Sequence, residues 1–413
     1  MGQATDAMEL PLNQQLHARY PELSRDPIPT SRITSHDYFE EEREAIFAKS
    51  WLQVAMTSDL PQPGSYFVRD IPTLSTSIIV SRARDGSIHA FKNVCPHRGM
   101  KLCVVGRHTH SRINCPFHGW GFDLAGKLVG VPGEEYFLDL DKTRLGLKPV
   151  HVAEWSDLIF VNLAQEPSTS IEQFLGELVE DFRGYFAIEH WQPVRNYEWT
   201  LDFNWKLYLD SSVEGYHAAF VHLFNNTGQV AATNPAPLWL PNDWIRLFKD
   251  HRVIGVPQNI GQRDLAPMEA LAFRHGSVAA YSGGGTTLPP GINPEKSNAW
   301  AFDILEIFPN SVMFLSANLF GIIRLWPVAA NRTHCELEVY LPAATTAAGL
   351  VSQEYGVLSL RDVVREDMNT AVAIQSVAEA DGEFVLCDQE IAVRHQYETT
   401  HRHVEEHRRA ANA

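Results

Sequence analysis

Two cysteine–histidine pairs constrain what this chain can fold into more than any other feature of its sequence. Cys95 and His97 lie in one short stretch, Cys115 and His118 lie in a second, and 17 residues separate the two pairs. Each stretch also contains a proline, which fixes φ, and a glycine, which lets the backbone turn tightly and bring N–H groups toward sulfur. The two stretches are therefore predicted to be loops that hold one metal centre between them.

The residue types leave two interpretations of this metal centre open. A structural zinc site of the Cys2His2 type normally takes both cysteines from one loop and both histidines from another, whereas here each loop supplies one of each. The pattern resembles the Rieske [2Fe-2S] domain, in which one iron binds two thiolates and the other binds two imidazoles. The resemblance implies that Cys95 and Cys115 bind one iron and that His97 and His118 bind the other.

The sequence around these loops predicts an all-β module. Apolar segments at 66–71, 77–83 and 88–93 are short, and the Asp85-Gly86 pair between the last two is typical of a hairpin turn. The same strand-and-turn pattern continues to residue 163. An amphipathic helix is predicted before the module, over 36–50.

After the module, the pattern predicts helices and an antiparallel sheet. Apolar and polar residues alternate with period two from Tyr197 to Trp205, as in a half-buried strand. Further strands separated by short turns predict a meander. These strands are expected at 303–308, 312–317, 320–328 and 335–341. A long helix is predicted over 353–378.

A second group of metal-binding residue types follows the alternating strand. Glu214, His217 and His222 lie within nine residues, and two histidines with a further carboxylate can hold Fe(II) in a facial triad that leaves positions open for oxygen. The spacing of three places Glu214 and His217 on one helix face. Five residues correspond to a rotation of roughly 140° on a helix, so the helix is predicted to end or bulge between His217 and His222.

This segment resembles the catalytic alpha subunit of Rieske non-haem iron oxygenases, of the aromatic-ring-hydroxylating dioxygenase type. The resemblance rests on Asn204-Trp205-Lys206, on the run from Glu214 to His217, and on His222. It implies that His217 and His222 bind a mononuclear Fe(II) and that Glu214 bridges His217 to His118 of a neighbouring subunit for electron transfer. Asn204 is a further candidate catalytic residue.

The long predicted helix offers the third iron ligand. Asp367 falls in the middle of an apolar stripe, where a buried carboxylate needs a cation or a hydrogen-bonding partner, while Glu366 and Asp362 are expected to face solvent. The stripe consists of Leu360, Val363, Val364, Met368, Ala371 and Ile374. From the pattern alone, a hydrogen-bonded structural aspartate remains open. The resemblance implies that Asp367 is the ligand, because the family's helix reads Glu-Asp with a glutamine eight residues later, here Gln375.

The expected fold class is α+β, with an all-β Rieske module inserted into an α+β catalytic domain whose antiparallel sheet is flanked by helices, of the helix-grip type. An N-terminal helical segment at 1–50 is expected to pack on the catalytic domain. The Rieske [2Fe-2S] domain is expected at 51–165, and the catalytic mononuclear iron domain at 166–413.

The composition of the chain limits which binding partners and which cellular compartment are expected. The formal net charge of -16 gives a surface that repels phosphate backbones, so no nucleic acid is expected. The sequence has no apolar run of about 18 residues and no signal peptide, so no membrane association and a cytoplasmic location are expected. Five cysteines in 413 residues are too few and too scattered for a disulfide framework.

The resemblance implies the terminal oxygenase component of a multicomponent enzyme. Its cofactors are a [2Fe-2S] cluster and Fe(II), and its electrons come from NAD(P)H through a reductase, with or without a ferredoxin. A homotrimer is expected, with or without a beta subunit. Zinc at both sites, and a Rieske electron carrier without catalysis, remain the alternatives.

The expected reaction uses O2 to hydroxylate an aromatic or similarly apolar small molecule, as in aromatic hydrocarbon catabolism. Phenylalanines suit such a pocket, and the candidates are Phe220, Phe224, Phe314 and Phe320. The alternative is oxidative N-demethylation or monooxygenation of a betaine-like or carnitine-like quaternary amine. Two departures from the dioxygenase pattern keep it open: Glu rather than Asp at position 214, and Asp210-Ser211 where the family often has Glu-Asn.

Overall fold

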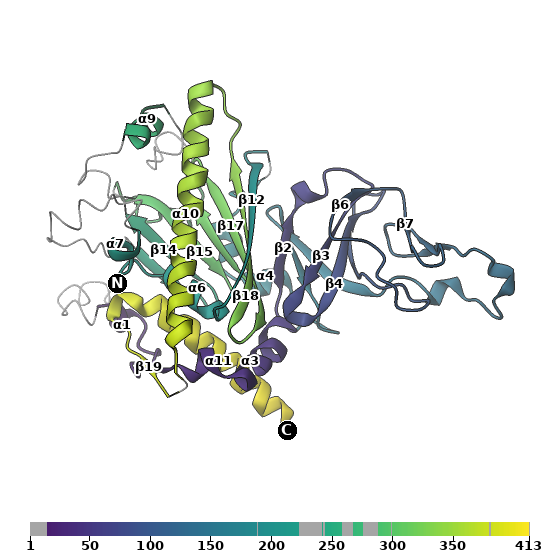
Figure 1. The fold of residues 1–413 in the computed structure, drawn as a ribbon, viewed down its shortest axis with the longest axis horizontal. Coiled ribbons are helices and arrows are strands. Elements are labelled where there is room, and N and C mark those ends of the chain that lie inside the picture. The colour runs from purple at the N-terminus through teal and green to yellow at the C-terminus, as the bar shows by residue number, and fades with distance from the viewer. Residues whose placement is uncertain are drawn as a thin grey trace. The chain divides into compact units, whose positions relative to one another are not determined.

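The computed structural model divides the chain into two compact units (Figure 1). It describes residues 15–187, 189–222, 242, 244–257, 267–275, 288–298, 300–379 and 381–412. The larger unit comprises residues 1–45, 175–185 and 189–413, and the smaller unit comprises residues 46–174 and 186–188. A β-rich unit is thus inserted into the sequence of an α+β unit, which confirms the predicted fold class.

The inserted unit is built on a seven-stranded antiparallel sheet with the order β2-β11-β10-β5-β4-β3-β6. Its strands are β2 (Leu52–Met56), β3 (Ser65–Ile71), β4 (Thr76–Arg82), β5 (Ile88–Lys92), β6 (Gly106–Thr109), β10 (Pro149–Trp155) and β11 (Leu158–Asn162). A smaller sheet contains β7 (Ile113–Asn114), β8 (Gly121–Phe122) and β9 (Leu128–Gly130). Helix α4 (Ile171–Leu175) follows the strands. The predicted Asp85-Gly86 turn joins β4 to β5, and Gly86 has a φ of 88°.

The larger unit contains a second seven-stranded antiparallel sheet, with the order β12-β18-β17-β16-β15-β14-β13. Its strands are β12 (Gln192–Leu201), β13 (Trp244–Leu247), β14 (Arg252–Pro257), β15 (Trp300–Ile307), β16 (Ser311–Leu315), β17 (Phe320–Ala329) and β18 (Arg332–Leu341). The run from β15 to β18 is the predicted meander. A two-stranded pair joins β1 (Ile28–Pro29) to β19 (Glu383–Phe384).

The larger unit also contains helices, which precede, interrupt and follow the strands of this sheet in the sequence. The helices of the larger unit are α1 (Gln15–Arg19), α2 (Ser31–Thr34), α3 (His36–Glu42), α5 (Leu178–Asp181), α6 (Trp205–Ser212), α7 (Ala218–Val221), α9 (Pro267–His275), α10 (Ala347–Val377) and α11 (Ile391–Ala411). A π-helical turn (Arg43–Phe47) continues α3. None of these described helices has both the length and the apolar composition that a membrane span requires.

Helix α10 runs across the sheet with α6 beside it (Figure 1). The approach is close at Gly321 of β17, where an added Cβ atom would lie 3.0 Å from Leu360 of α10. Val364, Asp367 and Met368 are buried in this contact, as the apolar stripe predicted, whereas Ile374 is 38% exposed. The stripe therefore predicts burial in the middle of the helix but not at its C-terminal end.

The predicted alternating strand begins and ends earlier in the sequence than its pattern. β12 ends at Leu201, and α6 begins at Trp205. The side chain of Asn204 accepts a hydrogen bond from the N–H of Lys206 and so caps the helix. The apolar residue Trp205 is buried in the first turn of α6 rather than on a strand.

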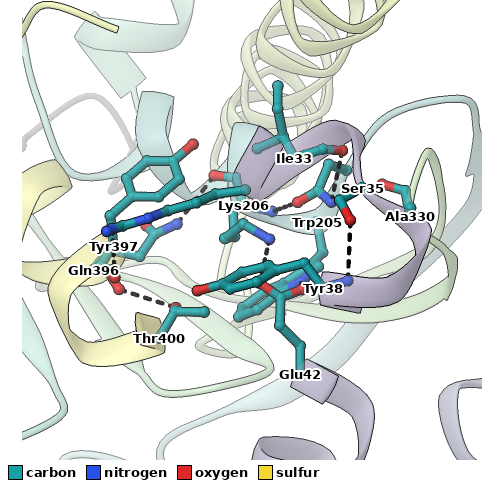
Figure 2. A network of polar contacts seen from close by, with 12 residues as sticks. Ile33, Ser35, Tyr38, Glu42, Trp205, Lys206, Ala330, Gln396, Tyr397 and Thr400 are labelled. Carbon is teal, nitrogen blue, oxygen red and sulfur yellow. Dashed lines mark hydrogen bonds and ion pairs between the residues drawn. The ribbon is translucent and has the colours of Figure 1, made fainter. Parts of the chain in front are cut away.

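A buried polar network fixes the start of α6 (Figure 2). The Lys206 ammonium lies 2.5 Å from the Glu42 carboxylate, and Trp205 Nε1 donates to the other oxygen of Glu42 at 3.0 Å. Gln396 of α11 donates to the Lys206 carbonyl at 3.2 Å. Burial raises the pKa of Glu42 and lowers that of Lys206, against their mutual attraction. The N-terminal helices and α11 therefore hold α6, whose C-terminal end leads into the second group of histidines.

Candidate metal centres

The two Cys–His loops of the inserted unit have matching backbone hydrogen bonds. The N–H of Cys95 donates to the carbonyl of Met100 at 2.8 Å, and the N–H of Cys115 donates to the carbonyl of Trp120, also at 2.8 Å. Both cysteines are buried in the core of this unit. The loops thus present their thiols inward in the same local geometry.

A glycine closes each of these loops. Gly99 and Gly119 have φ values of 74° and 73°, in the left-handed region that favours glycine. Each glycine donates its N–H at 3.0 Å to the carbonyl of the cysteine four residues earlier. The tight turns predicted from the glycines are present, and they explain why a residue with a Cβ atom would strain either loop.

The two histidines of these loops lie close together nearer the surface. The ring centroids of His97 and His118 are 4.7 Å apart, and His97 stacks on Trp120 with an angle of 5° between the rings. His118 is exposed, whereas the two thiols are buried. The loops therefore present one thiol pair and one imidazole pair at different depths.

This arrangement fits a two-iron cluster better than a single ion. Burial raises the pKa of Cys95, and the neighbouring Cys115 thiol raises it further, so a thiolate pair here requires a cation. Among the described residues, these four side chains do not form a group with three ligand atoms within 4.8 Å of one another. A thiolate pair on one iron and an imidazole pair on the other is the donor set of a Rieske cluster.

The larger unit brings His217, His222 and Asp367 together. His217 Nε2 lies 3.1 Å from His222 Nε2, and the Oδ1 atom of Asp367 lies 3.3 Å and 3.4 Å from these two atoms. Two ligands at about 2.1 Å from one ion and at right angles would be about 3.0 Å apart. The triangle therefore fits one metal ion bound on a single face, as the sequence predicted for these three residues.

The polar atoms of this triangle require a cation. Asp367 Oδ1 is buried and makes no hydrogen bond to any of the described residues. Burial lowers the pKa of His217, but the carboxylates of Asp367 and Glu214 outweigh burial and raise it to about 10. A positive charge is thus favoured where the three side chains meet, and a divalent metal supplies that charge.

A carboxylate contacts the outer nitrogen of each histidine. His217 Nδ1 contacts Glu214 Oε1, and His222 Nδ1 lies 2.8 Å from Glu366 Oε2. An Nδ1–H group that donates to a carboxylate leaves the Nε2 lone pair free for a metal. Both contacts therefore favour the tautomer and ring orientation that metal binding needs.

One prediction about this segment fails and one is confirmed. Glu214 and His217 do not share a helix face: α6 ends at Ser212, α7 begins at Ala218, and Glu214 lies in the loop between them. The helix does end before the second histidine, since His222 is the C-cap residue of α7. The loop brings Glu214 back to His217 because the Glu214 carboxylate accepts the backbone N–H of His217 at 3.2 Å.

The prediction that Glu366 faces solvent is wrong. Its side chain is only 15% exposed, and its carboxylate contacts His222 Nδ1. Sequence reasoning also missed Tyr208 of α6, which is fully buried. Burial first and the charge of Asp367 second raise the pKa of Tyr208 well above its usual value, so the Tyr208 hydroxyl belongs to the polar surroundings of the triangle. In the sequence, Glu366 could have been found only from its place beside Asp367, and Tyr208 only from its helical spacing from Asn204.

Asn204 has the contacts of a structural residue. Its Oδ1 atom caps α6, and its Nδ2 atom donates to the carbonyls of Ile33 at 3.2 Å and Ala330 at 2.6 Å. Its backbone N–H donates to the side chain of Gln375 at 2.9 Å. These hydrogen bonds support a structural role for Asn204, and its catalytic role stays a prediction.

The four candidate pocket residues have different surroundings. Phe320 is fully buried among Tyr185, Trp191 and Tyr340, which are the contacts of a core residue rather than of a pocket lining. Phe314 is also buried, with its ring 6.1 Å from that of Phe302. Phe220 lies on α7 between the two histidines and is 63% exposed. Phe224 lies outside the described residues.

Comparisons with known proteins match both units of the chain. The family described as "Ring hydroxylating alpha subunit (catalytic domain)" matches residues 188–406. The family described as "Rieske [2Fe-2S] domain" matches residues 50–144. The first match alone covers more than half of the chain.

Curated relatives match over part of their length. The carnitine monooxygenase oxygenase subunit of Acinetobacter pittii is 34% identical over 195 residues, which are 47% of this chain and 52% of the relative. The glycine betaine monooxygenase oxygenase subunit of Chromohalobacter salexigens is 35% identical over 184 residues, which are 45% of this chain and 40% of the relative. The 2-aminobenzenesulfonate 2,3-dioxygenase subunit alpha of Alcaligenes sp is 32% identical over 193 residues, which are 46% of this chain and 48% of the relative. The chain thus spans about half the length of the curated relatives it matches.

Solved structures share the fold over almost the whole chain. The quaternary ammonium Rieske monooxygenase CntA in complex with gamma-butyrobetaine matches with a TM-score of 0.69 at 22% identity, over 94% of this chain and 98% of that chain. Naphthalene 1,2-dioxygenase from Rhodococcus sp. bound to indole matches with a TM-score of 0.71 at 22% identity, over 95% of this chain and 98% of that chain. With the two family matches, these similarities show that the chain belongs to the ring-hydroxylating alpha subunits and carries a Rieske [2Fe-2S] domain.

Proposed function

We propose that this chain is the terminal oxygenase component of a multicomponent Rieske oxygenase. It would use O2 and electrons from NAD(P)H, delivered by a reductase, to oxidise a small molecule. The observation that carries this proposal is the convergence of His217, His222 and Asp367 on one point, in a chain whose other unit is a Rieske domain. When bound, the [2Fe-2S] cluster and the mononuclear iron supply electron transfer and the activation of O2.

Two alternatives explain fewer of these observations. A Rieske electron carrier needs only the inserted unit and gives no reason for the partly buried triangle of two imidazoles and a carboxylate. Structural zinc in the Cys–His loops does not account for one thiol and one imidazole in each loop. The oxygenase assignment accounts for both groups of residues.

The chain's own residues prepare the mononuclear site. The Glu214 carboxylate accepts a hydrogen bond from His217 Nδ1–H. This bond directs the Nε2 lone pair of His217 toward the point where His222 and Asp367 also converge. Asp367 supplies the one carboxylate of this triangle. Three protein ligands on one face leave the opposite face for O2 and substrate.

Electron transfer between neighbouring copies is the proposed second role of Glu214. Exposed apolar side chains flank the Cys–His loops of the inserted unit: Val104, Phe117, Tyr136 and Leu138 are 72%, 50%, 85% and 95% exposed. Exposed apolar groups of this kind are typical of protein interfaces. They support a head-to-tail cyclic homotrimer in which His118 of one copy meets Glu214 of the next.

A quaternary ammonium compound with a carboxylate is the proposed substrate class, with monooxygenation as the reaction. The carnitine and glycine betaine monooxygenase relatives support it, as does Glu rather than Asp at position 214. Phe220, exposed between the two histidines, could attract a quaternary ammonium group through its ring face. This reverses the preference for an aromatic substrate that the phenylalanines alone suggested. An aromatic acid is the second candidate, supported by the 2-aminobenzenesulfonate 2,3-dioxygenase relative.

Oxygen uptake by the purified chain tests this proposal. The full chain, supplied with NADH and a Rieske oxygenase reductase, is expected to consume O2 in the presence of L-carnitine, gamma-butyrobetaine or glycine betaine and to form an oxidised product in proportion. The matched control is the His217→Ala variant, which should consume no substrate-dependent O2. Product from 2-aminobenzenesulfonate alone would favour the second candidate. Oxygen uptake that no compound of either class stimulates would contradict the oxygenase assignment.

A further inference from the structure

Glu366 and Asp367 are consecutive residues of α10 that contact opposite nitrogens of one imidazole ring. Glu366 Oε2 lies 2.8 Å from His222 Nδ1, and Asp367 Oδ1 lies 3.4 Å from His222 Nε2. We propose that Glu366 is a positioning residue that holds His222 for the metal and strengthens metal binding at the mononuclear site. This proposal rests on the proposed function only in requiring that His217, His222 and Asp367 bind iron.

The two histidines depend on different parts of the chain for their orientation. His217 is held by Glu214, which lies in the same loop three residues earlier. His222 is held by Glu366, which is 144 residues away and on the helix that also carries Asp367. Helix α10 therefore supplies one ligand and orients a second. Without Glu366, His222 would lose the hydrogen bond that its Nδ1 atom makes among the described residues.

The surroundings of this pair make the charge of Glu366 effective. The His222 and Glu366 side chains are 12% and 15% exposed, and the attraction between partial and full charges is stronger there than in water. A carboxylate partner fixes the tautomer of an imidazole and makes its other nitrogen a better metal donor. Replacement of such a partner typically lowers metal affinity or activity by about 10- to 100-fold.

Asp362 gives a matched control on the same helix. It lies one turn before Glu366, is 51% exposed and pairs with Arg361 rather than with a histidine. Asp362→Asn and Glu366→Gln each remove one negative charge from α10 without changing side-chain size. Only Glu366→Gln replaces the carboxylate that contacts His222. A difference between the two variants therefore reports the contact and not the net charge of the helix.

The experiment measures Fe(II) affinity at the mononuclear site by competition with a chromophoric chelator. The full-length wild type, Asp362→Asn, Glu366→Gln and Glu366→Asp are compared, with the visible absorption of the [2Fe-2S] cluster as a check on folding. The rhombicity of the EPR signal from the Fe(II)–nitric oxide adduct serves as a second readout of ligand geometry. Neither readout depends on turnover.

Glu366→Gln is expected to weaken Fe(II) binding by about 10- to 100-fold and to change the EPR signal, with an unchanged cluster spectrum. Asp362→Asn should match the wild type, and Glu366→Asp, which keeps the charge, should recover part of the affinity. Glu366→Gln with affinity within about twofold of the wild type and the same EPR signal would overturn the proposal. If the wild type itself binds no Fe(II) outside the cluster, the proposed function fails instead, so the two failures are distinguishable.

Discussion

Asp367→Ala is expected to empty the mononuclear site and leave the [2Fe-2S] cluster in place. Asp367 supplies the one carboxylate of the triangle, and its buried Oδ1 atom makes no hydrogen bond in the described structure. Without it, two imidazoles remain, and the positive charge of the metal loses its anionic ligand. Iron should fall from about three to about two per chain, and substrate-dependent oxygen uptake should fall to background.

Iron analysis of the purified variant, with its visible spectrum, checks this expectation. Asp362→Ala is the matched control because this exposed aspartate lies on the same helix and pairs with Arg361. It should keep all iron and all activity. If Asp367→Ala retained the full iron content, Asp367 would be a structural aspartate rather than a ligand, which is the alternative that the sequence pattern left open.

Glu214→Ala has the second largest expected effect, on electron transfer rather than on the content of iron. The variant removes the carboxylate that contacts His217 Nδ1 and the proposed bridge to His118 of a neighbouring subunit. His217, His222 and Asp367 all remain, so both metal centres should stay occupied when Fe(II) is supplied in excess, even though loss of the His217 partner weakens iron binding. Turnover should fall by at least about 100-fold, since such supporting residues affect activity by 10- to 100-fold even without a bridging role.

Rapid mixing of the reduced variant with substrate and O2 separates bridging from orientation. The rate at which the reduced cluster is reoxidised is expected to fall with turnover if Glu214 is part of the electron path. Glu366→Gln is the matched comparison, because it alters the partner of the other histidine and leaves Glu214 in place. Reoxidation of the Glu214→Ala cluster at the wild-type rate would contradict the bridging role.

Much of the fold follows from local patterns in the sequence. Strand segments with turn residues between them predicted the meander from β15 to β18, because antiparallel neighbours need only short connections. The Cys–His pairs predicted matched loops, because each carries its own proline and glycine. The apolar stripe predicted that Asp367 is buried, which the structure confirms, and the family resemblance singled it out as a ligand.

The predictions that failed depend on contacts between distant segments. Glu366 was placed toward solvent because helical periodicity cannot show that His222, 144 residues earlier, covers that side of α10. The place of Phe320 in a buried aromatic cluster could not be predicted either, because composition cannot distinguish such a cluster from a pocket lining. The alternation that runs to Trp205 did not show that a helix begins there. The Asn204 side chain caps this helix by accepting a hydrogen bond from the N–H of Lys206.

The iron content and visible absorption of the purified full chain test the central claim most directly. Two metal centres in one chain predict about three irons per chain and the broad visible absorption of a Rieske cluster. About one of these irons should be removable by a chelator without loss of that absorption. Zinc at either centre, or a cluster without any further iron, would contradict the assignment of this chain as a Rieske oxygenase.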